Sequence, residues 1–455
     1  MKKNITYLVL VFLFQTNFIY AQFIVKDITF ACNSVSNGGA VSGYSFQTGP
    51  YSIWFPDSNN IVTEIGGVAP GSGVAGQARF SEDGNILCGT NLGNAGAEMA
   101  LFNRTTNNWT NLGSLGYQVD GNVSGGFAIS GDGKTVVGLS WADTTGNLAF
   151  AHAIAWNNDE EIMDLGTLFF GRSTRANAIN GDGSIVVGWQ EFNGPWESAV
   201  WEKNPAGGYF PNEYILLNTD GDPNDEFNQM GECSAISADG NWIGGYGDYA
   251  NEYQPWIWSE GSGVINLGTL PNVGSGYVSG MSADGSIAVG WFDGQLWGDP
   301  QTPFIWTKTG GIRDLNEYIN TELGESTDIN HTYTAEAISP DGHFVAGYGV
   351  NNNTFQYFAY RISLENTSAV KEISKSNEIT VYPNPTSNLI TIENSNNIVF
   401  FGGAGVSTES GIPDFRSKDG LYNQHDVQFD KYEPEYLLSR ECLYNNPKVF
   451  YEFYR

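Results

Sequence analysis

Short apolar runs recur along the chain, and a polar turn precedes each of them. The clearest example is Ser130-Gly131-Asp132-Gly133-Lys134 followed by Thr135-Val136-Val137-Gly138. Asp-Gly favours a tight turn, because glycine adopts a positive φ without a Cβ clash. The apolar run that follows is typical of a buried strand. Each copy of the pattern therefore predicts a β-hairpin.

The pattern S-x-D-G-x-x-x-x-G repeats at a nearly constant interval. The closing glycines lie 45 to 57 residues apart, which is the period of a repeat architecture. In the earliest copy Asn37-Gly38 stands in place of Asp-Gly, and in the fourth Asn180 replaces the serine. The seven copies span residues 36–43, 81–89, 130–138, 180–188, 237–245, 282–290 and 339–347.

Each repeat carries further short strands after its hairpin. Aromatic strands occur at residues 153–156, 199–201, 255–258 and 303–306, and L-G-T-L follows at 165–168 and 267–270. Four short strands per unit match one propeller blade. We therefore predict a mostly β fold, with a propeller of about seven blades in residues 23–363. These motifs resemble the HAF-type extracellular repeats of secreted bacterial proteins, and their Asp-Gly pairs are interpreted as turn chemistry.

Residues 1–22 have the pattern of a secretory signal. A basic start, Met1-Lys2-Lys3, precedes the apolar run Tyr7 to Phe14, and Ala21 supplies a small residue near the end. The run is too short to span a bilayer stably, which makes a membrane anchor the less favoured alternative. We expect cleavage near Ala21, an exported product and no membrane span after cleavage.

Charge and cysteine content narrow the possible partners. The chain has a formal charge of −30, and residues 23–397 hold 12 Lys and Arg against 41 Asp and Glu. Such an acidic surface repels phosphate backbones, which argues against nucleic acid as a partner. The four cysteines show no C-x-x-C spacing, so a zinc site is not expected.

No catalytic motif is visible in the repeats. An inserted loop offers clustered oxygen ligands for Ca²⁺, but Asp225 and Gly231 stand where an EF-hand needs glycine and glutamate. A plain solvated acidic loop is the favoured alternative to a calcium site. For the propeller we expect a binding role, with an extracellular glycan or protein as ligand of its aromatic surfaces. The calcium candidates are Asp220, Asp222, Asn224 and Glu226.

After the repeats, the composition changes. Residues 364–378 are polar and suit a linker. Residues 379–396 contain Tyr382-Pro383-Asn384-Pro385 and an alternating strand, which resembles the opening of the C-terminal sorting domain of type IX secretion substrates. The resemblance implies a β-sandwich that directs outer-membrane passage and surface attachment, here truncated. Together with the signal, it predicts a secreted or surface-attached protein.

Residues 397–455 change character again. A buried strand at 398–401 runs into a glycine-rich loop and a probable helix, a geometry that places a dinucleotide phosphate against backbone N–H groups. Gly403-Ala404-Gly405-Val406-Ser407 and Ser410-Gly411-Ile412-Pro413-Asp414-Phe415-Arg416-Ser417 resemble the sirtuin family of NAD-dependent protein deacylases. The resemblance implies NAD as cofactor, with Phe415 near the nicotinamide. The implied cofactor-binding residues are Gly403, Ala404, Gly405, Thr408, Asp414, Phe415 and Arg416.

The sirtuin resemblance also implies residues that this chain lacks. In that family the catalytic histidine and two zinc-binding cysteine pairs lie downstream, and His425 and Cys442 do not match them. Zinc is therefore expected for the family but has no ligands here. We predict an incomplete Rossmann-like α/β fragment that is unable to deacetylate an acetylated protein alone, because 58 residues cannot complete its parallel sheet.

The two ends of the chain imply different compartments. An exported propeller belongs outside the cytoplasm, whereas a sirtuin uses intracellular NAD. We interpret the chain as a composite, either an artefactual join or a rare fusion. Two functions stay open: a secreted binding module with a sirtuin-like NAD-binding segment, and an NAD-dependent protein deacetylase.

Overall fold

The computed structural model divides into two compact units, residues 1–372 and 373–455. It describes residues 23–45, 50–68, 76–143, 149–191, 196–210, 214–216, 229–247 and 254–364, together with six residues between 436 and 449. The division at 372 lies within the range of the predicted linker, and all the predicted domain borders stay predictions. In the described part of the chain, no helix is both long and apolar enough to cross a membrane.

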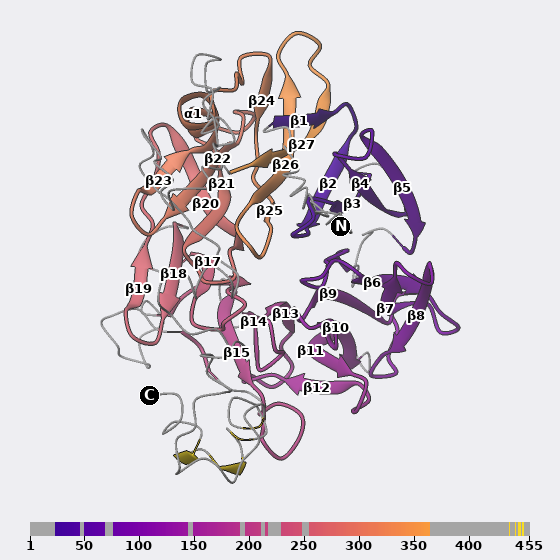
Figure 1. Cartoon of the computed structure of the whole chain (residues 1–455). Helices are drawn as coiled ribbons and strands as arrows, with labels where there is room; N and C mark the ends of the chain where they lie inside the picture. The colour runs from indigo at the N-terminus through magenta and orange to yellow at the C-terminus, as the bar shows by residue number, and fades with distance from the viewer. Residues whose placement is uncertain are drawn as a thin grey trace, which may run out of the picture. The chain divides into compact units, whose positions relative to one another are not determined.

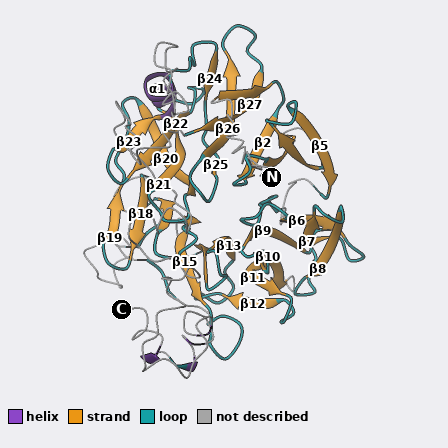
Figure 2. Ribbon diagram, in the orientation of Figure 1, coloured by secondary structure: helices purple, strands orange, loops and turns teal. Residues whose placement is uncertain are grey.

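Seven antiparallel sheets form the first unit, and Figure 1 shows them side by side around a common centre in chain order. The mostly β fold and the seven-bladed propeller are confirmed. Nearly all of the regular structure in Figure 2 is strand. A short α1 (Leu315–Tyr318) and a π-helix (Ile319–Leu323) lie between the sixth and seventh blades.

Each blade is a sheet whose strands follow one another in sequence. The first blade comprises β2 (Phe30–Val35), β3 (Val41–Ser45), β4 (Tyr51–Phe55) and β5 (Ile61–Gly66), and the second comprises β6 (Ile86–Leu92), β7 (Ala97–Asn103) and β8 (Asn108–Gly113). The third comprises β9 (Ser124–Ile129), β10 (Thr135–Asp143), β11 (Phe150–Asn157) and β12 (Met163–Gly166). The fourth comprises β13 (Thr174–Ile179), β14 (Ile185–Gln190) and β15 (Glu197–Glu202).

The fifth blade comprises β16 (Cys233–Ile236), β17 (Ile243–Tyr246), β18 (Pro255–Ser259) and β19 (Gly263–Asn266). The sixth comprises β20 (Val273–Met281), β21 (Ile287–Gly294), β22 (Thr302–Thr307) and β23 (Gly311–Asp314). The seventh comprises β24 (Asn330–Thr332), β25 (Ala337–Ile338), β26 (Phe344–Asn351) and β27 (Tyr357–Ser363).

The start of the described chain closes the ring. Strand β1 (Phe23–Lys26) pairs antiparallel with β27, and Phe23 lies opposite Ile362. It therefore serves as the outermost strand of the seventh blade. An ion pair reinforces this closure, since Arg361 in β27 binds Asp57 of the first blade, a solvent-exposed residue, through two hydrogen bonds. The Arg361 side chain is fully buried and stacks on Phe344 with 4.5 Å between guanidinium carbon and ring centre.

The S-x-D-G motif forms the turn between the first two strands of a blade, as predicted. In the third blade the Ser130 hydroxyl donates to Asp132 Oδ1 over 2.6 Å and accepts the Thr135 amide over 3.0 Å. Asp132 Oδ1 accepts the Lys134 amide over 3.1 Å, and Gly133 has a φ of +73°. The carboxylate of the repeat aspartate therefore accepts hydrogen bonds from within its own turn.

The earliest copy differs from the predicted alignment. Gly39, with a φ of +74°, takes the place of the turn glycine, and Gly38 takes the place of the aspartate. The Ser36 hydroxyl accepts the amide of Ala40, four residues on, whereas Ser130 accepts from the residue five positions on. This turn is one residue shorter, so the alignment of Asn37-Gly38 with Asp-Gly was wrong.

Tryptophans fill the core only in part. Trp54, Trp201, Trp256 and Trp306 are buried within or between blades, as predicted. Trp297, however, is fully exposed at 103%, because it lies in the connection between β21 and β22. A tryptophan in the repeats is therefore not by itself a core residue.

Candidate functional site

A cavity of about 440 Å³ lies at the centre of the propeller, between the first strands of the blades. Its wall combines aromatic rings with four charged side chains, Arg79, Arg175, Glu232 and Glu336. The size is within the range of small-molecule sites. The remaining lining residues are Ala31, Cys32, Asn33, Tyr44, Gln77, Phe127, Asn177, Trp196, Ser234, Tyr246, Tyr277, Val278, Ser279 and Trp291.

One position of the repeat supplies much of this wall. It lies three residues before the serine or asparagine of the turn motif, and it lines the cavity in six blades. Its neighbours are small or apolar, as in A-N-A-I-N and A-E-A-I-S, while the position itself varies between blades. Sequence reasoning missed this position. A residue type that changes from blade to blade between small or apolar neighbours is the sequence signal that would have identified it. The six residues are Asn33, Phe127, Asn177, Ser234, Ser279 and Glu336.

Several of these side chains connect neighbouring blades. The Asn177 amide donates to the Cys233 carbonyl over 2.7 Å, and Asn33 accepts the Ala78 amide over 3.1 Å. The hydroxyls of Ser234 and Ser279 each donate over 2.5 Å to a carbonyl of the next blade, Val278 and Ala335 respectively. The inner strand edges that face the channel are thus partly capped by side chains.

Arg175, in β13, is held in place by polar and aromatic neighbours. Its Nη2 lies 3.0 Å from Glu232 Oε1, and its Nε donates to Asn177 over 2.7 Å. The guanidinium carbon lies 4.8 Å from the centre of the Phe127 ring and 5.9 Å from that of Trp196. The charge of Arg175 is therefore paired before any ligand arrives.

A pair of tryptophans extends this wall. The rings of Trp189 and Trp196 are stacked with centres 4.4 Å apart and planes 6° apart. Arg175 contacts the same pair, with its guanidinium carbon 5.4 Å from the centre of Trp189. The stack presents a flat aromatic surface of defined orientation at the cavity.

Arg79, on the inner edge of the second blade, has no such partner. Its Nε donates to Gln77 over 2.9 Å, but no carboxylate among the described residues lies within 4.0 Å of its guanidinium. Burial, and then repulsion by Arg175, lower the pKa of Arg79 from its ordinary value. Arg79 is half-buried, and a cation in this position without a counterion is available to an anion from outside.

Glu336 contributes an acid that holds its proton. Its Oε2 is shielded from solvent and has no hydrogen-bond partner among the described residues. Burial raises the pKa of Glu336 to about 8, against smaller lowering contributions from the Cys32 amide and the Thr334 side chain. The side chain is therefore mostly neutral at pH 7.

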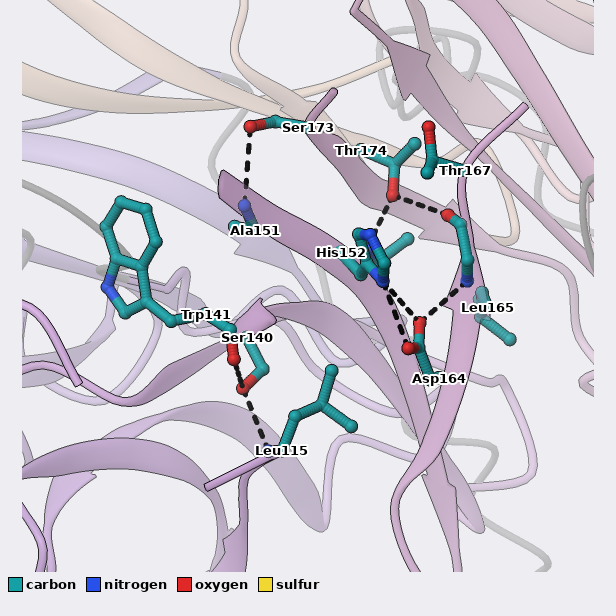
Figure 3. A network of polar contacts seen from close by, with 12 residues as sticks. Leu115, Ser140, Trp141, Ala151, His152, Asp164, Leu165, Thr167, Ser173 and Thr174 are labelled. Carbon is teal, nitrogen blue, oxygen red and sulfur yellow. Dashed lines mark hydrogen bonds and ion pairs between the residues drawn. The ribbon is translucent and has the colours of Figure 1, made fainter. Parts of the chain in front are cut away.

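A histidine–aspartate pair lies elsewhere, in the third blade (Figure 3). His152 Nδ1 is 2.9 Å from Asp164 Oδ1, an arrangement that orients an imidazole. The hydroxyl opposite it in the sheet, Ser140, donates instead to the Val123 carbonyl and accepts the Leu115 amide. The other ring nitrogen, His152 Nε2, is shielded from solvent and has no hydrogen-bond partner among the described residues.

The site residues predicted from sequence lie outside the described residues. This holds for the calcium candidates in the 218–226 loop, for the NAD-binding set at 403–416 and for the sorting segment at 379–396. Among the residues that the structure describes, no group of three or more His, Cys, Asp or Glu is placed to hold a metal ion. The structure thus leaves those site assignments as predictions.

Comparison with known proteins gives separate matches for the C-terminal segment and for the propeller. Residues 403–455 match the model of the Sir2 family. The segment is 60% identical over 65 residues to an NAD-dependent protein deacetylase of Cutibacterium acnes and 57% identical over 65 residues to one of Clostridium perfringens. Each match covers 14% of this chain and 25% of the relative, so the chain spans about a quarter of the length of these curated relatives.

Solved structures match the propeller at low similarity. The β-propeller domain of the Trilobed protease from Pyrococcus furiosus has a TM-score of 0.43 and 11% identity, with coverage of 74% of this chain and 98% of the other. An oligogalacturonate lyase from Vibrio parahaemolyticus has a TM-score of 0.44 and 13% identity, covering 75% and 91% respectively. The chain thus combines a seven-bladed propeller with a partial Sir2-family segment similar to sirtuin deacetylases.

Proposed function

We propose that the propeller is an extracellular binding module whose ligand enters the central cavity. The observation that carries the proposal is the composition of the cavity wall: an aromatic surface beside a half-buried arginine that no described carboxylate pairs. A wall of this kind suits a ligand that has both an apolar face and an anionic or polar group. His152 and Asp164 do not line this cavity.

The distribution of exposed apolar side chains supports a binding face. In each blade the connection from second to third strand, and the connection to the next blade, lie on one face of the ring, which we call the pocket face. The S-x-D-G turns lie on the opposite face. Of the twelve large hydrophobic residues that the structure shows exposed, only Ile61 and Phe210 belong to the turn face. The other ten are Leu92, Tyr117, Leu168, Phe170, Trp196, Leu296, Trp297, Ile329, Phe355 and Tyr357.

The cavity opens toward this same face. Trp291 and Tyr246 lie at or near the ends of second strands, and Arg175 lies near the start of a first strand. All three positions adjoin the connections of the pocket face. A cluster of exposed aromatic and aliphatic residues around a cavity marks an interaction site rather than ordinary surface.

The experiment is a binding screen with the full chain. Oligosaccharides and peptides are tested on an array, and the hits are measured by isothermal titration calorimetry. Trp196→Ala should weaken binding about fivefold or more, since stacking contacts of this kind contribute about 1 kcal/mol. Phe210→Ala, on the turn face, is the matched control and should bind normally. Equal loss in both variants, or a ligand that ignores Trp196, would show that the cavity is not the site.

Export of the propeller is part of the same proposal. The signal-like residues 1–22 and the resemblance of residues 379–396 to a type IX sorting domain support a secreted or surface location. Expression with and without residues 1–22, followed by mass spectrometry of the mature N-terminus, tests it. A product that keeps Met1 and stays inside the cell would contradict export.

A second function, NAD-dependent protein deacetylation, is favoured by the Sir2-family match at residues 403–455. The sirtuin relatives imply NAD as cofactor, with Arg416 in the binding segment. The segment holds one cysteine, Cys442, which does not match the two cysteine pairs that bind zinc in that family. Calorimetry of the full chain with NAD should show weak binding that Arg416→Ala abolishes. No heat of binding from a folded chain would refute this function and leave the propeller proposal standing.

A further inference from the structure

We propose that the central cavity selects an acidic sugar residue, with the ligand carboxylate on Arg79 and the sugar ring against the aromatic wall. The proposal rests on the binding function proposed above and names its ligand class. It follows from the charges of the cavity, from the neighbours of Arg79 and from what the inner strand edges can still bind.

Among the described residues, the charges of the cavity leave one positive group, Arg79, without a counterion. Arg175 and Glu232 form a close pair and cancel, and Glu336 is mostly protonated at neutral pH. Arg79 therefore gives the wall a net positive charge, within a chain whose formal charge is −30. A planar guanidinium binds a carboxylate through two parallel hydrogen bonds, which makes a carboxylate the fitting counterion.

Arg79 lies beside a surface that suits a sugar ring. It is near enough to Arg175 for mutual repulsion, and Arg175 stacks on Trp189 and Trp196. A ligand carboxylate on Arg79 therefore has aromatic faces within reach of the ring that carries it. The apolar C–H face of a pyranose packs on such rings, while Trp and Tyr polar atoms meet its hydroxyls. The protonated Glu336 adds a donor for a hydroxyl without repelling the carboxylate.

The inner strand edges disfavour an extended peptide. A peptide commonly binds a strand edge through main-chain hydrogen bonds. Here the carbonyls of Cys233, Val278 and Ala335 already accept hydrogen bonds from side chains of the preceding blade. A compact ligand that uses its own substituents is therefore favoured over a strand, and the volume of about 440 Å³ suits one or two sugar rings.

The test compares matched sugars on the full chain. Disaccharides that contain glucuronate, galacturonate or mannuronate are titrated at pH 7 against their neutral counterparts and against an acidic tripeptide. We expect at least one acidic sugar to bind about tenfold or more tightly than its neutral counterpart, because a hydrogen bond to a charged group contributes about 1.5–3 kcal/mol. Arg79→Gln should reduce acidic-sugar affinity to the neutral level and leave neutral binding unchanged. Arg313→Gln, outside the cavity, is the control.

The outcomes separate this inference from the proposed function. Neutral sugars that bind through Trp196 without any preference for the acid would overturn the acidic-sugar inference and keep the binding module. Binding of the acidic tripeptide alone would also overturn it, and binding of nothing at millimolar concentration would refute both. Arg79→Lys provides a second variant should Arg79→Gln fail to fold: it keeps the charge but loses the planar fork, so the acid preference should fall and not vanish. An unchanged preference in a folded Arg79 variant would refute the role of Arg79.

Discussion

Glu336 should make the propeller less stable as pH rises. The pKa of this acid is about 8 in the folded protein, against an ordinary value of 4.5. The folded state thus binds the proton more tightly than the unfolded state. The stability that protonation confers is fully present below pH 4.5, falls between pH 4.5 and 8, and is gone above pH 8. At about 1.36 kcal/mol per pH unit, the 3.5-unit difference amounts to at most about 5 kcal/mol.

The other titratable groups near Glu336 do not ionise in this pH range. Tyr44, Tyr348 and Tyr360 and the thiol of Cys32 all have pKa values raised above their ordinary values, chiefly by burial. These groups therefore stay neutral up to pH 9. Between pH 5 and 9 the change expected in this part of the cavity is the ionisation of Glu336.

The assay is urea unfolding of the full chain at several pH values, followed by tryptophan fluorescence. All 13 tryptophans lie between Trp54 and Trp306, so the signal reports the propeller alone. Glu336→Gln mimics the protonated acid and should remove most of the fall in free energy of unfolding between pH 5 and 9. Glu260→Gln, at an exposed turn, is the control. The reasoning is wrong if Glu336→Gln and the wild-type protein lose stability equally over this range.

Three further perturbations test the fold. Asp57→Ala leaves the buried guanidinium of Arg361 without its carboxylate, and urea unfolding should show that the free energy of unfolding falls by about 3 kcal/mol. A fall below about 0.5 kcal/mol, roughly that of an exposed pair, would contradict the burial of the Arg361 guanidinium. Gly133→Ala has ordinary space at 3.4 Å from Ser81 but a φ of +73°, so it should cost about 1 kcal/mol through backbone strain alone; no measurable cost would refute the turn geometry. Hydrogen bonds from neighbouring serines lower the pKa of Asp284 to about 2, so its contribution to stability is present above pH 3.8 and is lost as pH falls toward 2. Acid titration of Asp284→Asn should show a shallower loss than the wild-type protein over that range, and an identical profile would count against this pKa.

The sequence by itself determined the parts of this protein that depend on neighbouring residues. Six of the seven turns follow from a serine or asparagine, an aspartate and a glycine within a few positions, because their hydrogen bonds close over two to five residues. The number of blades follows from counting all seven turns. The Sir2-family segment could also be recognised from sequence, because the residues of its motif are contiguous in the chain. The one misaligned turn, at Gly38 and Gly39, failed where the repeat is a residue shorter.

Only the tertiary structure decided the binding site. Arg79, Arg175 and Glu336 come from three blades and are brought to one cavity by closure of the ring, which also pairs β1 with β27. Sequence predicted aromatic surfaces in general, but it did not show which rings face the channel or that Trp297 faces solvent. The proton on Glu336 depends on burial, and the lack of a described carboxylate beside Arg79 depends on distances between blades. Such properties arise from contacts across the ring, and no local pattern encodes them.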